Sequence, residues 1–62
     1  MYNMTDKVGD LEIQTRNVRG VWLTEFRRDG HVVSTVAATT SPSRAHSNHL
    51  WVVKQQQNKL SA

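Results

Sequence analysis

Cysteine is absent from this chain of 62 residues, proline occurs once, and only four residues are aromatic. Without cysteine there is no disulfide framework and no thiolate metal site. No apolar run approaches the ~18 residues that span a bilayer, and no basic start with an apolar stretch after it resembles a signal peptide. We therefore expect a cytoplasmic protein with no membrane partner.

Apolar residues are also scarce, at 37% of the chain. A domain of this length buries only roughly 60% of the surface that its unfolded chain exposes. Oligomerisation is one way to strengthen so thin a core, which leaves room for a homodimer.

Acidic residues are few: five, against eight lysines and arginines, which gives a formal charge of +3 and a pI of about 10.0. A pI above ~9 with clustered basic residues is typical of proteins that bind nucleic acids. The same excess on a small domain also serves solubility, so charge alone supports both interpretations.

A β-hairpin over residues 21–37 organises the rest of the chain. Two runs rich in β-branched and aromatic residues flank Asp29-Gly30, and Asp-Gly is a strong hairpin signal. A two-residue type I′ turn would pair Arg28 with His31, whereas a three-residue turn with a bulge at the glycine would pair Arg27 with His31. We favour the three-residue turn because it gathers the largest apolar side chains on one face: Trp22, Phe26, Val32 and Val36.

The remaining elements follow in chain order. Residues 1–9 are polar and indicate a flexible arm, and residues 10–60 form a single small domain. Apolar and polar residues alternate over 10–18, which indicates a first strand, and the hairpin supplies two more. The sequence therefore predicts a three-stranded antiparallel sheet.

A helix over about residues 42–59 completes the predicted α+β fold. Ser41 is a good N-cap, and Pro42 fits the first helical position. One face of this helix would carry a stripe that covers the sheet: Ala45, His49, Val52, Val53, Gln56 and Leu60. The alternative is a fourth strand over residues 50–53, a β-like run, in a mainly β fold of four strands.

Basic and polar residues on the strands, turns and helix start are the candidate binding site. An exposed β-ribbon can enter the DNA major groove, where arginine reads guanine and threonine contacts other base edges. A helix start also suits a phosphate. The candidates for DNA contact are Arg16, Arg19, Thr24, Arg27, Arg28 and Arg44. The plain alternative is a solvated polar face.

Three segments follow one another in the chain: the string from Gly20 to Gly30, a second strand, and a helix that opens with Ser41-Pro42-Ser43-Arg44-Ala45. This outline resembles the three-stranded sheet and helix of integrase arm-binding and AP2-type DNA-binding domains. The resemblance implies that the sheet reads the major groove. It covers about the last two-thirds of the chain. By position it implies roles for Arg19, Thr24, Arg27 and Arg28, although residues 32–38 lack the basic residues of that pattern.

Catalytic and metal-binding sets are not recognisable. The three histidines lack the partners of a four-ligand zinc site, and the acids and hydroxyls form no nucleophile or acid/base motif. We expect no enzyme activity, no cofactor and no metal.

A protein partner is the rival to DNA. Trp22 and Trp51 do not both fit easily into so thin a core, and tryptophan is enriched as an interface anchor. We take Trp22 as core and Trp51 as partly exposed. Trp51 and an edge strand could then dock on a host enzyme, as a phage-like inhibitor or adaptor would.

Overall fold

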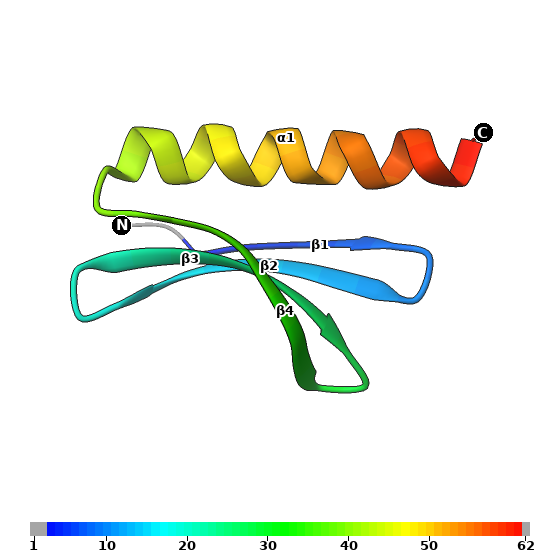
Figure 1. Cartoon of the computed structure of the whole chain (residues 1–62), viewed down its shortest axis with the longest axis horizontal. Coiled ribbons are helices and arrows are strands. Elements are labelled where there is room, and N and C mark those ends of the chain that lie inside the picture. Colours follow the sequence, from blue (N-terminus) through cyan, green and yellow to red (C-terminus); the bar gives the residue numbers. More distant parts are fainter. Residues whose placement is uncertain (1–2, 62) are drawn as a thin grey trace.

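The computed structural model describes residues 3–61, which form a four-stranded antiparallel sheet covered on one face by one helix (Figure 1). The elements are β1 (Met4–Val8), β2 (Leu11–Val18), β3 (Val21–Arg28), β4 (His31–Thr39) and α1 (Pro42–Ser61). The strands lie in chain order, each hydrogen-bonded to the next. The predicted α+β fold is confirmed, but the sheet has four strands and not three. The additional strand, β1, occupies residues that the sequence placed in the flexible arm. Residues 1 and 2 of that arm lie outside the described residues.

Two-residue turns join all four strands, and each uses a residue with positive φ. Gly9 takes φ +62° in the first turn, the value of the first position of a type II′ turn. In the second turn Arg19 and Gly20 take φ +52° and +84°, and in the third Asp29 and Gly30 take +54° and +80°. Positive φ at both central residues defines type I′, whose twist matches that of the flanking strands.

The third turn shows that the favoured three-residue closure is wrong. Asp29 itself adopts the left-handed conformation, which aspartate tolerates better than most residues, so Arg28 pairs with His31. Two register shifts follow, and they place Val33 and Val36 as extra residues in β4. The expected apolar face is therefore divided. Trp22 and Phe26 lie on the face that α1 covers, whereas Val32 and Val36 remain exposed.

The helix begins where the sequence predicts, and residues 50–53 belong to it and not to a fourth strand. The Ser41 hydroxyl accepts a hydrogen bond from the backbone N–H of Arg44 at 3.3 Å, and the Ser41 carbonyl accepts one from Ala45 at 2.9 Å. Ser41 is thus the N-cap. No helix within residues 3–61 combines the length and the apolarity that crossing a membrane requires.

The core lies between the sheet and the buried stripe of α1, which is close to the predicted one. Ala45, His49 and Val52 are buried, and Val53 and Gln56 partly so, but Leu60 at the end of the stripe is 65% exposed. From the sheet, Val8, Ile13 and Phe26 pack with Val52 and Val53 of the helix, and Trp22 is buried on the same face of the sheet.

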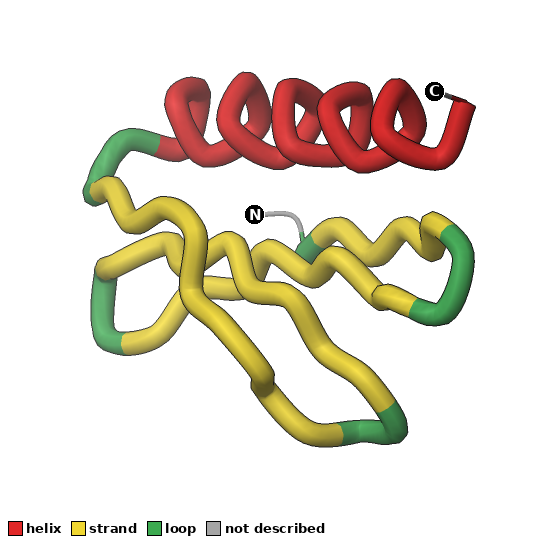
Figure 2. The backbone as a smooth tube through the Cα atoms, turned by 45° about the vertical axis from the view of Figure 1, so that its right-hand side comes forward, coloured by secondary structure: helices red, strands yellow, loops and turns green. Residues whose placement is uncertain are grey.

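The outer half of the β3–β4 hairpin extends beyond the helix. Both views show this hairpin bending away from α1, so that its tip lies far from the helix axis (Figures 1 and 2). Val32 and Val33 of this segment are 44% and 54% exposed. Because the hairpin bends away from the helix, β4 contributes no buried residue to the core although its sequence is apolar.

Candidate nucleic-acid interface

The sheet has one covered face and one open face. Neighbouring residues of a strand point to opposite faces, and directly paired residues share a face. Thr15 contacts α1 through His49, so its neighbours in β2, Gln14 and Arg16, point away from the helix. The residues that pair directly with these neighbours point the same way. We call this surface the open face. Its charged and amide residues on β1–β3 are Lys7, Glu12, Gln14, Arg16, Glu25 and Arg27.

A buried carboxylate holds two of the candidate arginines on the open face. Glu25 is only 3% exposed. The Nε of Arg16 donates a hydrogen bond to its Oε1 at 2.8 Å, and Nη1 of Arg27 lies 3.9 Å from the same oxygen. Removing a carboxylate from water is costly unless it is paired, so Glu25 depends on these cations. The structure thus brings Arg16 and Arg27 together.

Arg16 remains available to a ligand, whereas Arg27 is more occupied. The side chain of Arg16 is 44% exposed, and its bond to Glu25 uses Nε. Arg27 is 23% exposed, and its Nη2 donates to the Gly30 carbonyl at 2.9 Å. The guanidinium fork has five N–H donors, so one carboxylate bond orients Arg16 without using up the group.

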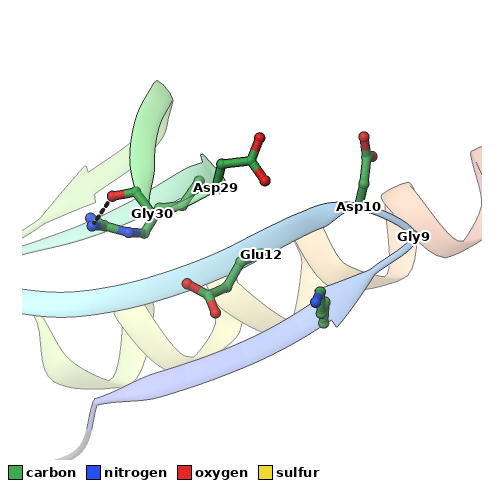
Figure 3. Close-up of a pocket in the computed structure, with 7 residues that line it drawn as sticks. Gly9, Asp10, Glu12, Asp29 and Gly30 are labelled. Carbon is green, nitrogen blue, oxygen red and sulfur yellow. Dashed lines mark hydrogen bonds between the residues drawn. The ribbon is translucent and has the colours of Figure 1, made fainter.

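The region between the β3–β4 hairpin and the β1–β2 turn carries acidic as well as basic side chains. Nε of Arg28 lies 3.2 Å from Oδ2 of Asp10. An open hollow of about 410 Å³ lies between this hairpin and the β1–β2 turn (Figure 3). It is lined by Lys7, Gly9, Asp10, Glu12, Arg27, Asp29 and Gly30. Three carboxylates against two cations make this hollow unsuited to a phosphate.

Two further candidates lie at the other end of the molecule. The β2–β3 turn, which contains Arg19, and the start of α1, which contains Arg44, are at the same end in both views (Figures 1 and 2). Arg19 and Arg44 are both exposed. In the part of the chain that the structure describes, neither arginine forms an ion pair, so this end keeps its positive charge.

Thr24 cannot belong to a binding surface. It is 1% exposed on the helix-covered face, and its hydroxyl lies 2.8 Å from that of Thr15. The alternation of β3 explains the difference, because Thr24 lies next to Glu25 and therefore on the opposite face. Thr24 is a structural residue and is removed from the candidate set.

A hydrogen-bond chain that includes Thr24 joins four elements of the fold. Nδ1 of His49 lies 2.7 Å from the Thr15 hydroxyl, and Nε2 lies 2.7 Å from Oδ2 of Asp6. Because a carboxylate only accepts, the Nε2 atom donates to Asp6. With a neutral ring, Nδ1 would then accept from the Thr15 hydroxyl, which would accept from Thr24. The network connects β1, β2 and β3 to α1.

This network has the order of groups of a hydroxyl–histidine–carboxylate triad, but no route for a substrate. Thr15 and His49 are both 0% exposed, so the hydroxyl cannot meet a substrate in this conformation. A nucleophile must reach the reacting atom before its activation matters. We therefore assign the network to stability.

The two tryptophans and the three histidines were the other candidate residues. Trp22 is 5% exposed and Trp51 is 63% exposed, as the division into core and surface predicts. His31 and His46 are exposed, whereas His49, which follows His46 by three residues in α1, is buried. Among residues 3–61, no three histidine, aspartate or glutamate side chains come together in a way that could hold a metal ion.

Sequence reasoning missed the polar residues that matter most to the structure: Asp6, Thr15, Glu25 and His49. One of them carried a signal, because His49 lies within the apolar stripe of the predicted helix and a core-facing histidine needs polar partners. Its partner Asp6 was hidden in the expected flexible arm.

Comparison with protein-family models, with curated proteins and with solved structures finds no match for this chain. The resemblance to arm-binding and AP2-type domains therefore stays an expectation from the sequence.

Proposed function

We propose that this chain is a small, non-enzymatic regulatory protein of the cytoplasm that binds DNA through the open face and the adjacent basic end. The observation that carries the proposal is Arg16, which Glu25 orients on an uncovered sheet face while 44% of its side chain stays exposed. A guanidinium held in one orientation is suited to bidentate contacts with guanine or phosphate.

The distribution of charge supports the same surface. Arg19 follows Arg16 by three residues, and Arg44 opens α1 at the same end of the molecule. All five acidic residues lie between positions 6 and 29, so the helix contributes only positive charge. We infer that Arg16, Arg19 and Arg44 contact the backbone or bases, with Arg27 in support and Arg28 held by Asp10.

Salt dependence tests this proposal. The affinity for duplex DNA is inversely proportional to the salt concentration raised to a power, and this power is about 0.9 times the number of phosphates contacted. Three contacts therefore predict a loss of about 40-fold between about 50 mM and about 200 mM salt, and two contacts a loss of about 12-fold. Fluorescence anisotropy with a labelled duplex measures both values.

The variant Arg16→Gln should weaken DNA binding to a similar degree for all duplex sequences, because it removes one of the three phosphate contacts. It should also reduce the salt effect toward the two-contact value. Lys54→Gln, which removes one exposed positive charge from the helix, is the matched control and should keep the wild-type salt dependence.

Loss of Arg16 also leaves Glu25 with a poorer partner, so a second variant separates binding from folding. The double change Arg16→Gln with Glu25→Gln removes the buried negative charge together with its main partner, and should bind DNA as weakly as the single variant. No binding at about 50 mM salt, or equal effects of Arg16→Gln and Lys54→Gln, would refute the proposal.

A protein-binding role is the second candidate, and the exposure of Trp51 favours it. Trp51 and Leu50 are 63% and 50% exposed on the outer side of α1. Such a pair is suited to anchor a protein partner such as a host enzyme. Trp51→Ala should then abolish capture of that partner without unfolding the chain, and capture that is fully retained would exclude this role.

A further inference from the structure

Three exposed valines lie on the edge strand of the sheet. Val32, Val33 and Val36 of β4 are 44%, 54% and 38% exposed, and we call them the valine edge. β4 is the last strand in the order, so within residues 3–61 no strand pairs with its outer side. The helix does not cover this segment, because the hairpin bends away from α1 (Figure 2). A two-stranded ribbon that is not covered is only marginally stable in water.

The valine edge also lacks the charges with which proteins normally protect an edge strand. From Val32 to Ser43 the chain has twelve residues and no charged side chain. The opposite edge, β1, carries Asp6 and Lys7 in a strand of five residues. Charged residues on an edge discourage pairing with another strand, and their absence leaves the backbone and the valines of β4 free to pair.

The two bulges of β4 do not substitute for charge. Bulges commonly curve an edge strand away from partners. In this strand the extra residues are Val33 and Val36, so each bulge adds an apolar side chain to the exposed surface. The bulges therefore enlarge the apolar area that a partner would cover.

We propose that β4 pairs antiparallel with β4 of a second copy of this chain. A two-fold axis perpendicular to the sheet relates the copies, so each valine edge meets its own equivalent. No like charges face each other, because the paired strands are uncharged beyond His31. Cross-strand pairs of valine, threonine and serine are favourable in such a ladder.

A second copy fits this edge better than a different protein. An edge without charge gives no electrostatic means of selecting a foreign partner, whereas identical β-branched strands complement each other in length and composition. Pairing about this axis leaves both helices on one side of an eight-stranded sheet. The two open faces then join into one surface, which adds to nucleic-acid binding but does not depend on it.

The oligomeric state of the full chain without nucleic acid tests the inference. Sedimentation equilibrium from about 10 µM to about 1 mM covers the affinities expected of an interface of modest size. We expect the mass to approach twice the 7.1 kDa of the monomer. Val33→Lys should raise the dissociation constant by at least about tenfold, since two unpaired ammonium groups would enter each interface.

The matched control is Leu50→Lys, which places the same charge on an apolar residue of similar exposure on α1. It should leave the dissociation constant unchanged. Circular dichroism checks that both variants keep the fold, which we expect because both positions are half exposed. A monomer at all concentrations, or a dimer that resists Val33→Lys but not Leu50→Lys, overturns the inference.

A cysteine scan gives an independent result, since the chain has no cysteine of its own. Single cysteines at 32, 33 and 36 bring two sulfurs together only where the copies pair within disulfide range, with Cα atoms about 4.4–6.8 Å apart. We expect an oxidised dimer from at least one of these positions and none from Leu50→Cys. Failure at all three positions would contradict the pairing, whatever the outcome of the DNA titration.

Discussion

The change Thr15→Val tests whether the buried hydrogen-bond chain stabilises the fold. Valine has nearly the shape of threonine but no hydroxyl, so the change removes one polar group without opening a cavity. Two buried partners then lose their hydrogen bonds: Nδ1 of His49 at 2.7 Å and the Thr24 hydroxyl at 2.8 Å. Each unsatisfied buried group costs about 1–3 kcal/mol, so for two groups we expect a total loss of about 2–6 kcal/mol.

That loss is large for this chain. A domain of 62 residues has a free energy of unfolding of roughly 3–9 kcal/mol, at about 0.05–0.15 kcal/mol per residue. The melting temperature should fall by at least about 8 °C, because each kcal/mol shifts it by about 4–8 °C in a domain of this size. Urea denaturation followed by circular dichroism measures the loss directly.

The control is Thr5→Val, the same change at an exposed threonine of β1, which should alter stability by less than about 0.5 kcal/mol. The double variant Thr15→Val with Thr24→Val leaves only His49 without a partner, so its loss should be smaller than the sum of the single losses by about 1 kcal/mol. If Thr15→Val changed stability as little as the control, the network would have no stabilising role.

Three further changes probe local features of the fold, by thermal unfolding and, for Trp51, also by fluorescence quenching. Ser41→Ala removes the N-cap hydroxyl and should cost about 0.5–2 kcal/mol, whereas Ser47→Ala on the exposed helix surface should be neutral or slightly stabilising. Gly30→Ala should cost about 1–2 kcal/mol, because φ is +80° while a Cβ would meet nothing within 4 Å; an unchanged melting temperature would rule out this strained turn. Trp51→Phe should change stability by less than about 0.5 kcal/mol and abolish most acrylamide quenching, since Trp22 is buried. Quenching that persists in this variant would place Trp22 at the surface.

The parts of the fold that the sequence predicts well are those set by local chemistry. Ser41 and Pro42 mark the helix start, and the Asp29-Gly30 pair marks the hairpin, because caps and tight turns depend on a few adjacent residues. The stripe of α1 is also local, since it follows from helical periodicity.

The missed features depend on partners that are distant in the sequence. Strand β1 is polar and short, and it is ordered by pairing with β2 and by the contact between Asp6 and His49, 43 residues apart. The register of β3 and β4 depends on where two bulges fall, which alternation alone does not reveal. As a result, Val32 and Val36 were expected in the core and are on the surface.

The candidate site was predicted in part for the same reason. Arg16, Arg19 and Arg44 are exposed as expected, because charged residues on strands and turns face water by default. The sequence did not reveal that Glu25 is buried between Arg16 and Arg27, since that contact crosses from β3 to β2. It also did not place Thr24 on the covered face, because that assignment requires the register of three strands.

The order of the strands has a consequence for how the chain folds. Each hairpin joins neighbouring segments through a two-residue turn, so most contacts are short in sequence and the sheet should form quickly. The link from His49 to Asp6 joins residues 43 apart, and α1 follows the four strands along the chain, so we expect this link to form after the sheet. Until the helix docks, a sheet formed from the four strands would present Thr15 and Thr24 to solvent on the face that the helix covers. We therefore expect these two hydroxyls to make the face of the uncovered sheet less apolar, and so less prone to aggregate, than a face of valines would be.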